Sequence, residues 1–322
     1  MKIRTFIYLS LALLLAFSCA PGKGGAKQAE TLATRKFPAT SLPAMVQDQQ
    51  VALQFMSQHF WDMFLKPTPG YRCDSLYIAG VEKGELEQNF ANFTYILDHM
   101  NMNEARKSLA SLAAKAEAYE QADSASNVFE GLSEIVERYL FDPNSPLRNE
   151  DYFQAYADRL SRSAFLAPAT RDKYAYISRM CALNAVGTKA ADFVFADKTG
   201  RQRNLHSIKA DYTLLFFSNP GCESCMEIIK ALKANQKVNQ MLAAGQLAVV
   251  NVYIDEDIQA WRDYMPVYPE AWYNGFDPNL IIRNENTYNV RAIPSLYMLD
   301  SQKTVLLKDA VPERLFELIE GI

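Results

Sequence analysis

Two patterns of apolar residues divide the chain near Val186. From about residue 45 to residue 186, apolar side chains recur at helical spacing, as in the series Leu86, Phe90, Phe93 and Leu97. Stripes one face wide are typical of amphipathic helices that pack on a common core. We therefore expect an all-α helical domain over residues 44–186. Its further helical segments are predicted over 51–65, 109–119, 132–140, 151–160 and 171–185.

After Val186 the pattern changes to short apolar runs separated by turns. Strands are expected over 193–195, 212–217, 247–254, 295–299 and 304–307, and helices over 222–234, 257–265 and 312–319. An order of strand, helix, strand, helix, then hairpin and helix predicts a small α/β sandwich. The predicted fold is an α/β domain over residues 187–322 preceded by the helical domain.

The first residues indicate export. Lys2 and Arg4 precede the apolar run 6–17, which is typical of a signal peptide and too short for a comfortable membrane span. Residues 16–19, Ala-Phe-Ser-Cys, resemble the lipobox of bacterial lipoproteins. The resemblance implies that residues 1–18 are removed and that Cys19 is lipidated. Residues 19–43 are rich in Gly, Ala, Lys, Thr and Pro without an apolar period, which predicts a flexible tether to the membrane. Ordinary cleavage after Ala20 is the alternative.

Composition and charge exclude several classes of function. The chain is 49% hydrophobic and 22% charged, as expected of a globular protein, and its net charge is -4 without a long basic run. This gives no electrostatic footprint for nucleic acid. The sequence has no Gly-rich phosphate loop and no HExxH motif, and its three histidines are scattered. We therefore expect no cofactor and no metal.

The stretch FFSNPGCESCMEI, residues 216–228, carries the candidate chemistry. Its CxxC pair, Cys222 and Cys225, follows a predicted buried strand and opens a predicted helix. At a helix N-terminus the backbone N–H groups and the helix dipole favour the thiolate of the first cysteine. We expect Cys222 to attack a disulfide and Cys225 to resolve the resulting mixed disulfide.

Several segments together resemble thioredoxin: residues 187–193, the strand entering Cys222-Glu223-Ser224-Cys225, and residues 290–295 with Ile293-Pro294. The resemblance is to the exported branch, whose members include cytochrome c maturation reductases and many lipoproteins of the Bacteroidetes. The preceding helical segment resembles a helical domain of unknown function that accompanies such thioredoxins. The likeness implies a thiol–disulfide oxidoreductase, with a cis peptide bond at Pro294 and with Ile293 and Pro294 contacting an extended substrate.

Some positions depart from the family pattern. Phe216 stands where thioredoxin has a buried Asp, and Ile228 stands where the cytochrome-maturation relatives have Glu. Glu223 lies between the cysteines, where a negative charge opposes thiolate formation at Cys222. Gly221 replaces a frequent Trp. The acid or base that assists exchange is therefore not assigned.

Two functions remain open for the cysteine pair. The first is a lipid-anchored periplasmic enzyme whose partners are cysteine-containing exported proteins and a membrane or periplasmic thiol redox protein. The second is a redox-inert, membrane-tethered binding protein in which Cys222 and Cys225 form a structural staple. A zinc site is disfavoured because Cys73 and Cys181 lack CxxC spacing. A peroxidase is disfavoured because its Pro-x-x-x-Thr-x-x-Cys motif is missing.

Two further features have alternative interpretations. The aromatic stretch over residues 261–276 is either an inserted helix and loop packed on the sheet or a docking rim formed by Trp261, Tyr268, Trp272 and Tyr273. Exposure of Trp272 would favour the rim. The other two cysteines outside the N-terminal segment, Cys73 and Cys181, are either separate thiols or a disulfide, which would require Cα atoms within about 7 Å.

Overall fold

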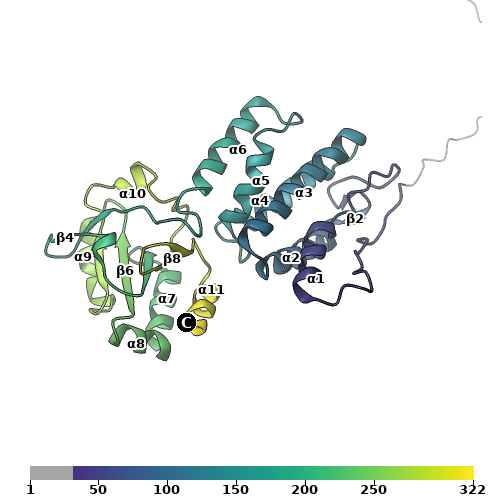
Figure 1. Ribbon diagram of the computed structural model, residues 1–322. Helices are drawn as coiled ribbons and strands as arrows, with labels where there is room; N and C mark the ends of the chain where they lie inside the picture. Colours follow the sequence, from purple (N-terminus) through teal and green to yellow (C-terminus); the bar gives the residue numbers. More distant parts are fainter. Residues whose placement is uncertain (1–31) are drawn as a thin grey trace, which may run out of the picture. The chain divides into compact units, whose positions relative to one another are not determined.

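The computed structural model describes residues 32–322 (Figure 1). The predicted signal peptide, Cys19 and most of the expected tether lie outside the described residues. Residues Ala33–Ile322 form one compact unit. No helix within the described range has both the length and the apolar character needed to cross a membrane.

The helical part consists of six helices around one core, with a small hairpin between the first and second helices. The hairpin strands are β1 (Tyr77–Ile78) and β2 (Val81–Glu82), which the apolar pattern did not predict. Leu86, Phe90 and Phe93 are fully buried, as the predicted stripe requires. The helices are α1 (Gln49–His59), α2 (Lys83–Asp98), α3 (Met102–Ala122), α4 (Val128–Leu140), α5 (Glu150–Leu160) and α6 (Pro168–Cys181).

Residues 33–37, which were predicted to belong to the flexible tether, instead contact the helical core. Ala33 forms a backbone β-bridge with Tyr71, and the guanidinium of Arg35 lies 4.1 Å from the centre of the Tyr71 ring. Phe37 packs against three aromatic rings of the helical core, including Phe64 at 5.6 Å between ring centroids. Burial of the Phe37 ring and the cation–π contact outweigh the freedom that a tether would keep.

The C-terminal part is a mixed sheet of seven strands in the order β4-β3-β7-β6-β5-β8-β9. The parallel neighbours are β5 with β6 and β6 with β7, while β8 runs antiparallel to β5. The strands are β3 (Val194–Ala196), β4 (Gln202–Asn204), β5 (Tyr212–Phe217), β6 (Leu247–Tyr253), β7 (Tyr273–Phe276), β8 (Ser295–Asp300) and β9 (Val305–Leu307). The helices are α7 (Glu223–Ala234), α8 (Gln236–Ala243), α9 (Ile258–Tyr264), α10 (Ile281–Asn284) and α11 (Pro312–Gly321).

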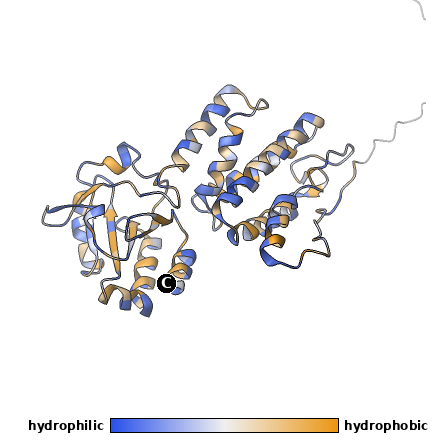
Figure 2. Cartoon of the chain, in the orientation of Figure 1, coloured by the Kyte–Doolittle hydropathy of each residue, from blue (hydrophilic) through white to orange (hydrophobic). Residues whose placement is uncertain are grey.

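Both faces of this sheet are covered, which explains the continuous apolar runs. On β5, Leu214 and Phe216 belong to one core cluster with α7, α8 and α11, whereas Leu215 and Phe217 belong to a second cluster on the opposite face. Successive side chains of a strand point to opposite faces, so a strand buried on both faces must be apolar throughout. The strands at the centre of the sheet are coloured mainly as hydrophobic in Figure 2, and every residue of β6 is buried, including the polar Asn251.

The aromatic stretch 261–276 belongs mainly to the core. Trp272 is only 6% exposed, and Trp261 and Tyr268 are also buried. The docking-rim interpretation is therefore wrong for these side chains. The expected inserted helix is α9, but the end of the stretch is strand β7, which lies inside the sheet between β6 and β3.

Buried charges connect the helical part to the sheet part. Glu150 at the start of α5 accepts hydrogen bonds from Arg291 Nε at 2.6 Å and Asn289 Nδ2 at 2.8 Å. Lys308 Nζ lies 2.9 Å from the same carboxylate and donates to the carbonyl of Cys181 at 2.6 Å. Arg291 also donates to the carbonyl of Phe141 and lies over its ring. Each of these contacts joins residues more than 100 positions apart in the sequence.

Candidate active site

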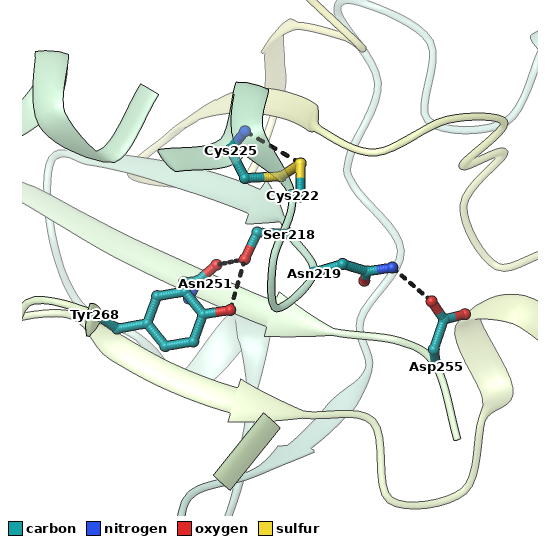
Figure 3. The surroundings of a disulfide bond; sticks show 7 residues. All are labelled: Ser218, Asn219, Cys222, Cys225, Asn251, Asp255 and Tyr268. Atoms are coloured by element: carbon teal, nitrogen blue, oxygen red, sulfur yellow. Dashed lines mark hydrogen bonds between the residues drawn. A yellow bond between two sulfur atoms is a disulfide. The ribbon is translucent and has the colours of Figure 1, made fainter. Parts of the chain in front are cut away.

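Cys222 and Cys225 form a disulfide at the N-terminus of α7 (Figure 3). Their Cα atoms are 5.2 Å apart. Cys222 is the N-cap residue of the helix, and its sulfur accepts a hydrogen bond from the backbone N–H of Cys225 at 3.1 Å. The predicted placement of the pair after strand β5 and at the beginning of a helix is confirmed.

The two sulfurs differ in their access to solvent. Cys222 is half-buried, whereas Cys225 is 2% exposed and packs in the core cluster below α7. The helix N-terminus and the Cys225 N–H both stabilise negative charge on the Cys222 sulfur. Glu223 is in the first turn and exposed, so its opposing charge is screened by solvent. An incoming sulfur therefore reaches Cys222 first.

Ile293 and Pro294 lie at the entrance to strand β8. Their peptide bond is cis, as the resemblance to thioredoxin implied. Both residues are half-buried, and together with Ser224 of the CxxC pair they line a groove of about 550 Å³. The structure therefore places the predicted substrate-contacting residues in a groove that also includes Ser224, and Ile293 and Cys222 both pack against the core cluster that contains Cys225.

The sequence did not predict a buried polar cluster near the end of β5. Ser218 Oγ donates to Asn251 Oδ1 at 2.6 Å and lies 3.4 Å from the hydroxyl of Tyr268 (Figure 3). Burial raises the pKa of Tyr268, so its hydroxyl stays protonated at neutral pH. Asn251 also donates to Asn274 Oδ1 at 3.1 Å. An Asn inside the apolar run LAVVNVY of β6 was the signal available in the sequence.

No carboxylate replaces the buried Asp of thioredoxin on β5. Phe216 occupies that position and is fully buried, and Ile228 is also buried. Asp255 accepts from Asn219 Nδ2 at 2.6 Å and forms an ion pair with Arg283 at 2.6 Å, so its charge is already compensated. The polar groups drawn nearest the disulfide are therefore mainly neutral donors and acceptors (Figure 3).

The other cysteines play no part in this site. Cys73 is half-buried and Cys181 is fully buried, and neither forms a disulfide within residues 32–322. Burial raises the pKa of Cys181 to about 12, which keeps it a thiol. In the same range no three His, Cys, Asp or Glu side chains converge as metal ligands. The proposed lipidation site Cys19 lies outside the described residues.

Comparisons with known proteins match both parts of the chain. A family model described as a domain of unknown function, DUF5106, matches residues 18–184, and one described as thioredoxin-like matches residues 210–305. No curated protein sequence matches the chain.

The chain also resembles solved structures. A crystal structure of a thioredoxin-like protein from Bacteroides caccae is 29% identical, with a TM-score of 0.77, and the match covers 90% of this chain and 99% of that one. The C-terminal domain of an uncharacterized protein from Bacteroides fragilis is 42% identical, covers 43% of this chain and 99% of its own, and has a TM-score of 0.42. A domain of a possible thiol-disulfide isomerase from Cytophaga hutchinsonii is 24% identical, with coverages of 42% and 92% and a TM-score of 0.37.

The DUF5106 model spans more than half of the chain, and the sheet that follows it carries the CxxC disulfide and the thioredoxin-like fold. The chain therefore belongs to the DUF5106 family, as a member in which a thioredoxin-like domain follows the family's helical domain.

Proposed function

We propose that the protein is a thiol–disulfide oxidoreductase that acts on the cysteines of other proteins. The observation that carries the proposal is the asymmetry of the CxxC pair at the N-terminus of α7. Cys222 is accessible and its sulfur accepts a backbone hydrogen bond, while Cys225 is buried behind it. A structural staple needs neither accessibility nor stabilisation of a thiolate.

The reaction follows from this geometry. In the reducing direction, the Cys222 thiolate attacks one sulfur of a substrate disulfide, that S–S bond breaks, and the second substrate sulfur leaves as a thiolate and takes up a proton. Cys225 then loses its proton and attacks the Cys222 sulfur of the mixed disulfide. The substrate is released as a dithiol and the protein is left with the Cys222–Cys225 disulfide. The oxidising direction is the same sequence of steps reversed.

The proposed location is the periplasm, with the mature chain anchored to a membrane through lipid on Cys19. Its support is the sequence alone: the positive residues, the apolar run and the lipobox-like Ala16-Phe17-Ser18-Cys19. Replacing Cys19 with Ala should abolish lipid labelling and move the protein to the soluble periplasmic fraction. A Cys19→Ala protein that stays on membranes would contradict the lipid anchor.

The experiment that tests the activity is trapping of mixed disulfides in cells. We expect tagged Cys225→Ser to hold partner proteins covalently on Cys222, because the thiol that normally resolves the mixed disulfide is missing. Cys222→Ser should hold almost none, because Cys225 is buried. Both variants carry Cys73→Ser, which removes a half-buried thiol from the background. Partners are separated on a non-reducing gel and identified after release with dithiothreitol.

One result would reject the enzyme and favour the binding protein. If Cys225→Ser and Cys222→Ser both trap nothing, and the Cys222–Cys225 disulfide of the purified protein resists mild reductant, the pair is a staple. If the variants do trap partners, the redox potential of the Cys222–Cys225 pair, measured against glutathione, assigns the reducing or the oxidising direction of the exchange.

A further inference from the structure

The groove beside the cysteine pair has walls from both parts of the chain. The sheet part supplies α7, the segment 292–294 and the first turns of α11, and the helical part supplies the connection between α4 and α5 through Pro143, Asn144 and Arg148. On α7 the lining extends from Ser224 to Ala231, which is about 10 Å at 1.5 Å per residue. That length matches about three residues of an extended chain.

The wall from the helical part is fixed to the sheet part. Arg148 Nε donates to the carbonyl of Asp309 at 3.0 Å, and Arg148 Nη2 donates to the carbonyl of Ala310 at 3.2 Å. Ser145 Oγ, in the same connection, donates to the carbonyl of Tyr139 at 2.6 Å. These bonds hold the α4–α5 connection beside the start of α11, so the groove is formed before a ligand arrives.

The unpaired charge along the groove is negative. Glu227 and Glu313 both line it and are exposed, and among residues 32–322 neither has a cationic side chain within 4.0 Å. Arg148 is the cationic side chain of the lining, and it lies 3.6 Å from the carboxylate of Asp309. The groove is therefore lined by two free carboxylates together with apolar residues such as Ile293 and Phe316.

We propose that this groove selects the substrate by the residues next to its cysteine, and that the helical domain takes part in that selection. The favoured occupant is an extended segment of an exported protein, with Lys or Arg near the cysteine and an apolar side chain between them. Extended backbone fits the length of the groove, and the cations complement Glu227 and Glu313. The inference rests on the proposed exchange activity and names its substrate class.

The test uses a protein of residues 32–322 that carries Cys73→Ser and Cys225→Ser. Cys181 is fully buried, so Cys222 is the reactive thiol of this protein. Two peptides of equal length carry one cysteine activated as a pyridyl disulfide, flanked by Lys in one peptide and by Glu in the other. The Cys222 thiolate attacks the peptide sulfur, the bond to the pyridine sulfur breaks, and thiopyridone leaves with the electron pair and is measured by absorbance. Each rate is divided by the rate of the same variant with uncharged dithiodipyridine.

We expect the Lys peptide to react about fivefold faster than the Glu peptide at low ionic strength, with a smaller ratio in high salt. Glu227→Gln combined with Glu313→Gln should bring the two normalised rates within about twofold of each other. Asn144→Trp places a large side chain in the helical-domain wall and should lower both normalised rates about tenfold. Ser124→Trp, at an exposed position in the α3–α4 connection, is the matched control and should behave like the parent.

Different failures identify different errors. A Cys222 that reacts with dithiodipyridine but shows equal rates for the two peptides overturns the charge preference. An Asn144→Trp protein that reacts like Ser124→Trp overturns the role of the helical domain. A Cys222 that does not react even with dithiodipyridine overturns the exchange activity, and this inference with it.

Discussion

Replacing Glu150 with Gln should weaken the connection between the helical domain and the thioredoxin-like domain. Glu150 is 2% exposed, and the side chain of its partner Lys308 is 1% exposed. Removing one partner of a buried ion pair costs about 3–5 kcal/mol because the other charge stays buried. Gln still accepts a hydrogen bond from Arg291, and Asp309 still lies 3.7 Å from that guanidinium. We therefore expect Glu150→Gln to lower the free energy of unfolding by about 3 kcal/mol, the lower limit of that range.

The assay is urea unfolding followed by tryptophan fluorescence. Trp61 reports on the helical domain, and Trp261 and Trp272 report on the thioredoxin-like domain, so a Trp61→Phe background isolates the second signal. With a slope of about 3 kcal/mol/M, a loss of 3 kcal/mol lowers the midpoint by about 1 M. If the two domains are coupled through Glu150, the unfolding transition reported by Trp61 and the transition reported by Trp261 and Trp272 should occur at different urea concentrations in Glu150→Gln.

The control is Glu134→Gln, which breaks an ion pair with Lys83 whose glutamate is 60% exposed. Exposed pairs contribute about 0–1 kcal/mol, so this variant should unfold almost as the wild type does. A Glu150→Gln protein within 1 kcal/mol of the Glu134→Gln control would refute the reasoning, because Lys308 would then tolerate the loss of its counter-charge.

Three further predictions concern buried groups. Burial raises the pKa of Asp309 to about 6 from 3.8, so the protonated carboxyl stabilises the fold below pH 4 and this stability is lost as the pH rises through 6. The unfolding free energy of Asp309→Asn, relative to that of the wild type, should therefore rise by up to about 3 kcal/mol between pH 4 and pH 7. A difference that does not change with pH would contradict this prediction. Ser218→Ala leaves Asn251 Oδ1 without its donor and should cost about 1–3 kcal/mol in urea unfolding, whereas a cost under 0.5 kcal/mol would show that the cluster is not structural. Trp272→Ala should lose about 3–5 kcal/mol of stability by removing packing against Phe216, and partner trapping by the folded protein should not change.

The sequence predicted the elements whose signals are local. Strand β5 was predicted over its full range, and α7 and β8 within one residue at each end, because apolar runs bounded by turns define them. Strand β7 was missed because Asn274 and Gly275 have low strand propensity. Its state is set by its neighbours β6 and β3. A Cβ on Gly275 would lie 2.5 Å from the ring of Phe195, so this strand position requires the smallest residue.

In the site, too, the residues of local motifs could be predicted from the sequence, whereas the contacts between distant segments could not. Cys222, Cys225 and Pro294 belong to short motifs, so the sequence identified them. The structure joins the two cysteines in a disulfide, and Pro294 lines a groove with Ser224, which lies between them in the sequence. The walls of the groove come from four separate segments, and no pattern along the chain indicates which segments meet. The buried charges were also not predictable, because Glu150 and Arg291 are 141 positions apart and each alone is typical of an exposed residue.

The positions of these charges indicate what the helical domain contributes. The sheet has its own core on both faces, so the thioredoxin-like domain does not need the helices to bury its apolar side chains. The contacts from the helical domain instead fall on Arg291, two residues before Ile293, and on the carbonyls of Asp309 and Ala310, just before α11. The residues that follow them, 292–294 and the start of α11, line the groove beside the CxxC pair. The helical domain therefore fixes the position of the groove walls, and under the proposed exchange activity this position would decide which polypeptides can reach Cys222.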